Sequence, residues 1–224
     1  MDVQLSATEA RTKYRLVHRI AAGGMGEVFL AKQEGPAGFV KTVVVKRILD
    51  HLASDEHFVQ MFLDEARLAA LLSHPNIVQI FELGTSDSTY FIAMEYIEGQ
   101  SLRAIMRRLK SKRISFNPVL VAKIASQVLR GLGYAHELKD SESHPVKIVH
   151  RDVSPDNVLV GINGSVKLAD FGIAKATAAK STTQNGLLKG KFHYIAPEII
   201  KGAAADFRSD IYSMGVVIYE ALAC

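Results

Sequence analysis

Short runs of alternating hydrophobic and polar residues fill the first hundred positions, a pattern that predicts β-strands with one buried face. YRLVHRIA, GEVFLAKQ and KTVVVKRI are such runs, and a glycine cluster separates the first two. YFIAMEYI is predicted to be a buried strand. One helix interrupts the strands, because apolar residues recur with helical spacing at Phe58, Phe62, Ala69 and Leu72. Residues 14–96 are therefore predicted to form a small sheet-rich lobe.

Helical spacing dominates after Ser101, most clearly in PVLVAKIASQVLRGLGYAHEL, and a final apolar helix is predicted from about Ser209. The segments 139–147 and 174–191 are polar and predicted to be loops. This order predicts an α+β fold in which a larger helical lobe, 97–224, follows the small lobe. Residues 1–13 are polar, mixed in charge and predicted to be an N-terminal extension.

Composition narrows the class of protein. The 224 residues are 48% hydrophobic, enough for one or two packed lobes, and the formal net charge is +4. We interpret the basic residues as scattered along the chain, without a basic stripe flanked by aromatic residues. This interpretation predicts that nucleic acid is not a partner. A single cysteine excludes an internal disulfide framework and favours the reducing cytoplasm. No apolar segment predicts a membrane span. Because Cys224 ends a helical pattern without a stop signal, we expect a piece of a longer protein.

The segment HRDVSPDN, residues 150–157, is followed by a predicted hairpin. Asn163-Gly164 between two apolar runs predicts a two-residue turn with both residues at positive φ. Counting outward from that turn places Asn157 opposite Asp170, with side chains about 5 Å apart on one face. An amide oxygen and a carboxylate placed in this way suit Mg²⁺. The alternative is a cross-strand Asn–Asp hydrogen bond at the mouth of the hairpin.

A second pair of charges is predicted in the small lobe. Lys46 alternates onto the same strand face as Val44 and Ile48, so its stem is predicted to be partly buried. Glu65 lies on the apolar stripe of the following helix, where a charge is costly unless it is paired. We therefore predict that Lys46 and Glu65 are partners. Because partly exposed pairs contribute only about 0–1 kcal/mol, positioning the lysine for a phosphate is favoured over a plain structural salt bridge.

Glycines in IAAGGMGEVFLA lie at a turn between two predicted strands. Backbone amides without side chains can approach phosphate oxygens closely, although an ordinary hairpin with glycine at positive φ explains the cluster equally well. No Gly-Lys-Ser/Thr follows, so this is not a Walker A loop.

These elements in this order resemble the eukaryotic-type protein kinases, and among them the bacterial serine/threonine members. The resemblance runs from Tyr14 to Cys224 through the glycine loop 20–28, Lys46, Glu65, the hinge MEYIEG, HRDVSPDN, DFG at 170–172 and APE at 196–198. It implies a bilobal kinase-like fold with a small antiparallel-sheet N-lobe and a mainly helical C-lobe, incomplete at the C-terminus. It also implies transfer of the γ-phosphate of Mg-ATP to Ser/Thr hydroxyls of protein substrates.

The resemblance also implies roles for individual residues. Asp152 is the catalytic base, Asn157 and Asp170 are the Mg²⁺ ligands, and Lys46, held by Glu65, contacts the α- and β-phosphates. The implied ATP site comprises Ile20, Ala21, Ala22, Gly23, Gly24, Met25, Gly26, Glu27, Val28, Val44, Lys46, Met94, Glu95 and Ile97.

In this family, an arginine at the position of Arg151 implies control by phosphorylation of the activation segment. The polar segment offers Thr177, Ser181, Thr182 and Thr183. We expect Thr182 or Thr183 to be autophosphorylated in trans, through a transient homodimer. The alternative is a polar loop in which serine and threonine are simply common.

Three positions depart from the family pattern. Ala21 replaces the first loop glycine, and Val44 replaces the small residue that covers adenine. Ser154 stands where serine/threonine-specific members carry a lysine that contacts the transferring phosphate, whereas Lys191 stands where those members carry a threonine. We therefore predict that hydroxyl and ammonium are exchanged, with Lys191 as a catalytic residue. Alternatively, Lys191 is a solvated loop lysine.

Two other functions stay open on the sequence alone. A pseudokinase that binds nucleotide and signals through partner contacts would explain Ala21 and Ser154, although Lys46, Asp152 and Asp170 are all in place. A small-molecule phosphotransferase would share the metal and base chemistry but would not need the APE segment.

Overall fold

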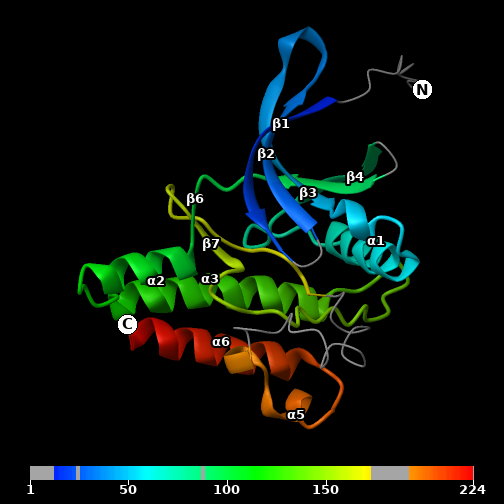
Figure 1. Cartoon of the computed structure of the whole chain (residues 1–224). Helices are drawn as coiled ribbons and strands as arrows, with labels where there is room; N and C mark the ends of the chain where they lie inside the picture. Colours follow the sequence, from blue (N-terminus) through cyan, green and yellow to red (C-terminus); the bar gives the residue numbers. More distant parts are fainter. Residues whose placement is uncertain (1–12, 24–25, 87–88, 173–191, 224) are drawn as a thin grey trace, which may run out of the picture. The chain divides into compact units, whose positions relative to one another are not determined.

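The computed structural model describes residues 13–23, 26–86, 89–172 and 192–223 (Figure 1). The chain forms two compact units, one of residues up to 59 together with 80–96, and one of 60–79 together with residues from 97 onward. The smaller unit ends at Tyr96, and the lobes 14–96 and 97–224 stay a prediction. Within the described ranges, no helix is long and apolar enough to cross a membrane.

The smaller unit is an antiparallel sheet of five strands in the order β1-β2-β3-β5-β4. The predicted strands form as expected, and the polar-rich strand β4 is one that the hydrophobic pattern did not reveal. In β3, Val43 and Val45 are buried on one face, whereas Lys46 is half-buried on the other. The strands are β1 (Lys13–Ala22), β2 (Gly26–Glu34), β3 (Val40–Ile48), β4 (Ile80–Ser86) and β5 (Thr89–Glu95).

Helix α1 (Glu56–Ala70) is the helix predicted in the first lobe. Most of this helix, together with the residues that follow it as far as Gln79, clusters with the larger unit rather than with the sheet. Leu72 and Ile77 belong to the larger unit's core, and the backbone amide of Val78 donates to the carbonyl of Leu168 at 2.9 Å. This long-range hydrogen bond explains why the division differs from the predicted lobes.

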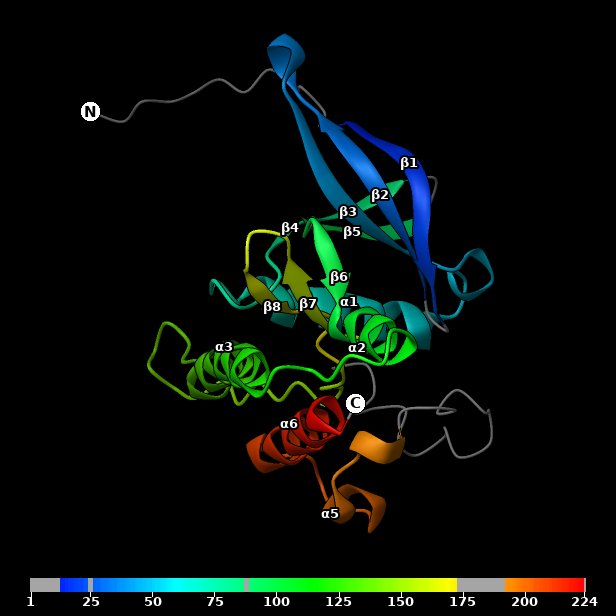
Figure 2. The ribbon, with the colours of Figure 1, turned by 90° about the vertical axis from the view of Figure 1, so that its left-hand side faces the viewer.

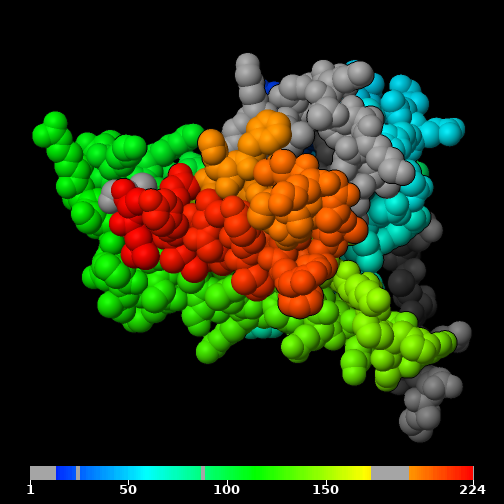
Figure 3. Space-filling view, turned by 90° about the horizontal axis from the view of Figure 1, so that it is seen from below, coloured from blue at the N-terminus to red at the C-terminus, as the bar shows by residue number. Residues whose placement is uncertain are grey.

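The larger unit is built on α3, which packs against both β8 and α6 (Figures 1 and 2). The hairpin that follows the HRDVSPDN segment consists of β7 and β8. Together with β6 it forms a small antiparallel sheet in the order β6-β7-β8. In Figure 3, α6 (red) and α5 (orange) form a band across the lower face beside the green helical segments. The elements are β6 (Gly99–Ser101), α2 (Leu102–Ser111), α3 (Pro118–Glu137), β7 (Val158–Gly161), β8 (Val166–Leu168), a short 3-10 helix (Phe192–Tyr194), α5 (Pro197–Ile200) and α6 (Phe207–Leu222).

Side chains at the helix starts fix where the helices begin. Asn117 caps α3 and accepts from the amide of Val119. Asp206 caps α6 in a reciprocal capping box with Ser209, so α6 begins two residues before the predicted start at Ser209.

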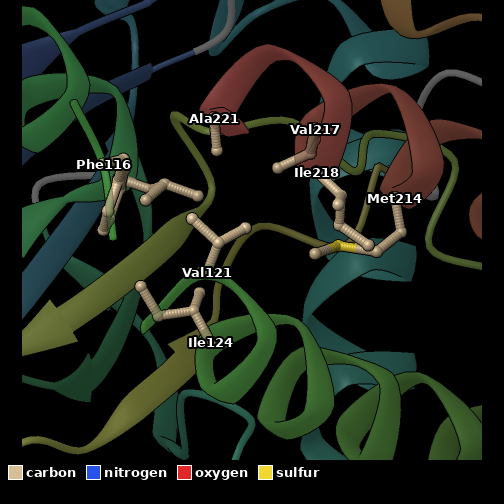
Figure 4. Close-up of a pocket in the computed structure, with 8 residues that line it drawn as sticks. Phe116, Val121, Ile124, Met214, Val217, Ile218 and Ala221 are labelled. Carbon is tan, nitrogen blue, oxygen red and sulfur yellow. The ribbon is translucent and has the colours of Figure 1, made fainter. Parts of the chain in front are cut away.

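Apolar side chains of α3 and α6 form the centre of the larger unit. Val121 and Ile124 from α3 point toward Met214, Val217, Ile218 and Ala221 from α6, with Phe116 beside them (Figure 4). The space left between them is about 10 Å³, which is no more than one water molecule occupies. This region is a packed core that fixes α6 on α3, rather than a ligand site.

The predicted two-residue hairpin turn is wrong. Gly161 and Ser165 close the loop, with the amide of Gly161 donating to Ser165 at 2.8 Å, so three residues lie between them. Among the three residues of this loop, only Gly164 has a positive φ, at 81°. This is the conformation of a three-residue loop that ends in a left-handed glycine. Val158 therefore pairs with Leu168, and the ladder places Asn157 beside Ala169 rather than opposite Asp170.

Candidate active site

His150 at the start of the HRDVSPDN segment is completely buried and holds the segment by its ring nitrogens. Nε2 lies 3.1 Å from the carbonyl of Ala169, and Nδ1 accepts from the amide of Asp152 at 3.2 Å. Burial lowers the pKa of His150, although the charges of Asp210 and Asp152 act in the opposite direction. The neutral ring, protonated on Nε2, therefore ties the loop to the strand before DFG.

Asp152 and Asn157, the predicted base and a predicted metal ligand, are in direct contact. The side-chain amide of Asn157 donates to the backbone carbonyl of Asp152 at 2.8 Å and to its carboxylate Oδ2 at 3.0 Å. Asn157 is buried and Asp152 is half-buried. Because the amide NH₂ is used twice on Asp152, the carboxylate is held in one orientation, and Oδ1 is the Asn157 atom suited to a cation.

Backbone hydrogen bonds join the DFG segment to the HRDVSPDN segment, residues 150–157. We call residues 150–157 the catalytic loop, after the role predicted for Asp152. The amide of Ala169 donates to the carbonyl of Asn157 at 2.9 Å, and that of Gly172 to the carbonyl of His150 at 2.7 Å. A Cβ at Gly172 would lie 2.9 Å from the Cβ of Asp152, so only glycine fits there. Asp170, between these two anchors, is exposed and has a positive φ of 53°.

The chemistry of these residues fits Mg²⁺. The amide oxygen of Asn157 and the carboxylate of Asp170 are hard oxygen donors, and Mg²⁺ is usually held by one or two protein ligands with waters and phosphates. Among the described residues, no group of three or more His, Cys, Asp and Glu could hold a metal ion. The oxygen donors of Asn157 and Asp170 suit Mg²⁺ better than Zn²⁺, which is most often bound by nitrogen and sulfur ligands.

Asp210 on α6 anchors the catalytic loop, and the sequence analysis did not identify it. Its carboxylate is buried and accepts from the backbone amides of His150 at 2.8 Å and Arg151 at 2.9 Å. His136 Nε2, at the end of α3, lies 2.8 Å from the same carboxylate. The signal was available, because Asp210 lies four and seven residues before Met214 and Val217 on the buried stripe of α6.

Two buried polar atoms of the catalytic loop have no hydrogen-bond partner in the described part of the chain: Arg151 Nε and Ser154 Oγ. A buried polar atom that stays without a hydrogen-bond partner lowers the free energy of unfolding by about 1–3 kcal/mol. Both belong to residues for which the sequence predicts a partner in the segment 174–191. That segment lies outside the described residues, and with it Thr177, Ser181, Thr182, Thr183 and Lys191.

A second missed group links α2 to the segment before α5. Arg103 Nη1 donates to Glu220 at 2.6 Å, Nε donates to Asp156 at 3.3 Å, and Nη2 donates to the hydroxyl of Tyr194. Tyr194 in turn donates to Glu220. Burial, followed by the hydrogen bond to Glu220, raises the pKa of Tyr194 to about 12. The network therefore connects the catalytic loop with the residues preceding APE.

In the smaller unit, the strand register brings predicted nucleotide-site residues onto one sheet face. Val28 pairs with Lys46, and Val44 pairs with Met94. Lys46 and Val44 are two residues apart on β3, so all four side chains lie on the same face.

The predicted glycine loop forms the β1–β2 turn. The amide of Gly23 donates to the carbonyl of Gly26 at 2.9 Å, and Ala22 pairs with Glu27. A Cβ at Gly26 would lie 2.6 Å from the carbonyl oxygen of Arg47, so close packing on β3 is one reason for this glycine. Ile20 and Ala21 lie at the end of β1, whereas Gly24 and Met25 are outside the described residues.

Three further residues predicted to belong to the site can be described within the unit to which each belongs. Glu65 is buried on α1, as its position on the apolar stripe predicted, and it belongs to the larger unit. Glu95 pairs with Val43 at the end of β5, and Ile97 is the first residue of the larger unit's second segment. The pairing of Lys46 with Glu65 stays a prediction.

Comparison with known proteins gives a consistent match. A family model described as a protein kinase domain matches residues 14–224. The tyrosine-protein kinase MasK of Myxococcus xanthus is 47% identical over 93% of this chain, which covers 32% of MasK. The serine/threonine-protein kinase PrkC of Bacillus subtilis is 34% identical over 94% of this chain, which covers 30% of PrkC. PknA of Mycobacterium tuberculosis, also a serine/threonine-protein kinase, is 38% identical over 94% of this chain, which covers 46% of PknA.

Solved structures agree with these relatives. The kinase domain of Mycobacterium tuberculosis PknI matches with a TM-score of 0.69 at 29% identity, over 94% of this chain and 74% of that one. The chain thus spans between 30% and 46% of the length of the three curated relatives named above.

Proposed function

Because the chain belongs to the protein kinase domain family, whose model covers residues 14–224, we propose that it transfers the γ-phosphate of ATP to Ser/Thr hydroxyls of protein substrates. Its fold is that of a protein kinase, with an antiparallel-sheet N-lobe and a mainly helical C-lobe. The observation that carries the proposal is the pair of hydrogen bonds by which Asn157 orients Asp152.

In the proposed reaction, Asp152 accepts the proton of the substrate hydroxyl as the oxygen attacks the γ-phosphorus. The bond between the γ-phosphorus and the β,γ-bridging oxygen breaks, and ADP leaves. The reaction needs alignment and charge neutralisation more than covalent catalysis. Asn157 fixes the carboxylate of Asp152, His150 accepts from the backbone amide of Asp152, and Asp210 fixes the backbone just before it. Lys46, from the same sheet face as Val28 and Val44, is proposed to bind the α- and β-phosphates.

Asn157 and Asp170 are the residues proposed to hold Mg²⁺, and Mg²⁺ would neutralise phosphate charge in the complex. The nucleotide base is proposed to bind beside Val44 and Met94, with the backbone of Glu95 and Ile97 as hydrogen-bond partners. The bulk of Val44 in place of a smaller residue narrows this site by about two methyl groups.

Serine and threonine specificity is supported by PrkC and PknA, whose names give that activity, whereas MasK is named a tyrosine kinase. The test is incubation with γ-labelled Mg-ATP, with and without generic protein substrates, followed by phosphoamino acid analysis. Labelled phosphoserine or phosphothreonine supports the proposal. Phosphotyrosine alone contradicts the specificity, and ATP binding without transfer to protein favours the pseudokinase scaffold instead.

We expect the activation segment to be autophosphorylated, with Thr182 or Thr183 as the acceptor. The support is Arg151, whose buried Nε has no partner among the described residues and whose charge suits a phosphate of about −1.5 to −2. Phosphopeptide mapping of active protein should find phosphate at one of these threonines and none in an Asp152→Asn sample. If Thr177, Ser181, Thr182 and Thr183 are all unmodified in active protein, the expectation is wrong.

We also expect Lys191→Ala to lower kcat by on the order of 10²-fold, as loss of one transition-state donor does. The buried, unpartnered hydroxyl of Ser154 supports an exchange of roles with Lys191. The measurement is steady-state kcat for a fixed acceptor peptide. The double variant Ser154→Lys/Lys191→Thr, which restores the family arrangement, should recover activity. Wild-type kcat in Lys191→Ala together with an inactive double variant would exclude the exchange.

A further inference from the structure

The basic residues are not scattered, contrary to the interpretation of the sequence above. Six of them fall within residues 103–113, a stretch without a single acidic residue. Removing these six from the 27 basic residues of the chain leaves 21 against 23 acidic ones. The net positive charge of the protein therefore comes from helix α2 and the turn after it.

Five of the six are exposed and make no ion pair with any described residue. Only Arg103 is used internally, in the network with Tyr194 and Glu220. We call the other five the α2 basic patch: Arg107, Arg108, Lys110, Lys112 and Arg113. Five uncompensated cations repel one another, so their grouping has an electrostatic cost that an anionic partner would relieve.

The patch borders a hollow in the surface of the larger unit. This hollow is lined by Ala104, Ile105, Ser111 and three of the cations, Arg107, Arg108 and Lys112. Helix α2 lies at the edge of the larger unit (Figure 1), where it packs against β6 and β7. A chain lying in this hollow would meet small and apolar side chains as well as several positive charges.

Resting on the proposed protein-kinase function, we propose that the α2 basic patch docks an acidic segment of the protein substrate, rich in Asp and Glu. The cations are spread over the second half of α2, from Arg107 to Lys110, and the turn after the helix, with Lys112 and Arg113. Spread, individually exposed charges match carboxylates distributed along a peptide better than one compact phosphate, which favours a preformed arginine fork.

Other anionic surfaces match the patch less well. The apolar face of α2 is already used, because Leu102 and Met106 are buried in the core and Leu109 packs against it. No apolar face remains to enter a bilayer, as an interfacial helix requires. The helix contains no aromatic residue on which a nucleobase could stack.

The position of α2 links docking to the reaction. Arg103, from the first turn of the helix, donates to Asp156 in the catalytic loop, and its backbone amide donates to the carbonyl of Pro155 at 3.0 Å. The same arginine contacts Tyr194, just before APE. A substrate bound to the patch is therefore tethered beside the loop that carries Asp152, which raises its local concentration there.

The test uses a fluorescein-labelled peptide of alternating Glu and Gly, with a Gln and Gly peptide as the neutral probe. Binding is measured by fluorescence anisotropy at low ionic strength without ATP, so the result does not depend on phosphotransfer. The patch variant replaces four cations by glutamine, and the control variant removes four exposed charges elsewhere on the same unit. The patch variant is Arg107→Gln, Arg108→Gln, Lys110→Gln and Lys112→Gln; the control is Lys123→Gln, Arg130→Gln, Lys139→Gln and Lys201→Gln.

We expect the acidic peptide to bind the wild-type protein, and added salt to weaken this binding. The affinity should be at least about tenfold weaker in the patch variant and within about twofold of the wild-type value in the control variant. A Ser-containing acceptor peptide extended with the acidic segment should gain kcat/KM by a similar factor, through KM, in the wild type and the control variant but not in the patch variant. Equal binding by the patch variant and wild type, or no binding at all, overturns the proposal. Patch-dependent binding of phosphatidylserine vesicles or an oligo-dT strand that exceeds peptide binding also overturns it. If the peptide binds through the patch but no phosphate is transferred, the docking surface stands and the proposed kinase activity is what fails.

Discussion

Replacing Asp152 by asparagine should lower kcat by on the order of 10²–10⁴-fold and leave the affinity for ATP close to that of the wild type. The asparagine cannot accept the hydroxyl proton, yet its side-chain oxygen can still receive the hydrogen bond that Asn157 donates to Oδ2 at 3.0 Å. The shape of the loop is therefore retained while the base is removed. Steady-state kcat with an acceptor peptide, together with ATP titration of the same sample, separates the two effects.

Asp156→Asn is the matched control for this experiment. Asp156 lies in the same loop but is exposed, and its contact with Arg103 at 3.3 Å is a partly solvated ion pair worth about 0–1 kcal/mol. The kcat of the Asp156→Asn variant should stay within about threefold of the wild-type value. If Asp152→Asn retains kcat within tenfold, or if Asp156→Asn loses as much, Asp152 is not the base.

Local patterns in the sequence predicted four of the five strands of the larger sheet and the long helices, because alternation and helical spacing follow directly from which face is buried. The error in the β7–β8 hairpin shows where such patterns stop. Asn163-Gly164 suits both a two-residue turn and a three-residue loop with glycine in the left-handed position. The two differ by one residue in register, and the structure has the longer loop, with Gly161 and Ser165 at its ends.

The rule that identified Glu65 also applies to Asp210, which was missed. A charge on a buried stripe needs a partner, and Asp210 lies on the buried face of α6 with Met214. Its partners could not be predicted from local spacing, because they include backbone amides 59 and 60 positions earlier in the chain.

Long-range partners lie beyond what local patterns predict. Arg103 and Glu220 are 117 positions apart, and nothing in the spacing of either residue indicates the other. The same holds for Asp210 and the amide of His150, separated by 60 positions. Only packing of α6 on α3, through the side chains of Figure 4, brings these groups together.

Asp210→Ala should therefore lower the free energy of unfolding by about 3–5 kcal/mol, the largest stability effect expected here. The substitution leaves the amides of His150 and Arg151 buried without their acceptor, and it removes the partner of His136. Urea unfolding, with the midpoint and slope compared between variants, is the measurement.

Two further variants make the interpretation of this loss specific. Asp206→Ala removes the cap of the same helix and an exposed ion pair with Arg208, and it should cost about 1 kcal/mol. Asp210→Asn keeps the shape and one acceptor oxygen but cannot serve both amides, so its loss should fall between the two. Because the anchored amides of His150 and Arg151 directly precede Asp152, the Asp210→Asn variant should also lose kcat at temperatures where it is fully folded. A loss in Asp210→Ala no greater than in Asp206→Ala would mean that the loop is held by its own contacts, His150 to Ala169 and Asn157 to Asp152, rather than from α6.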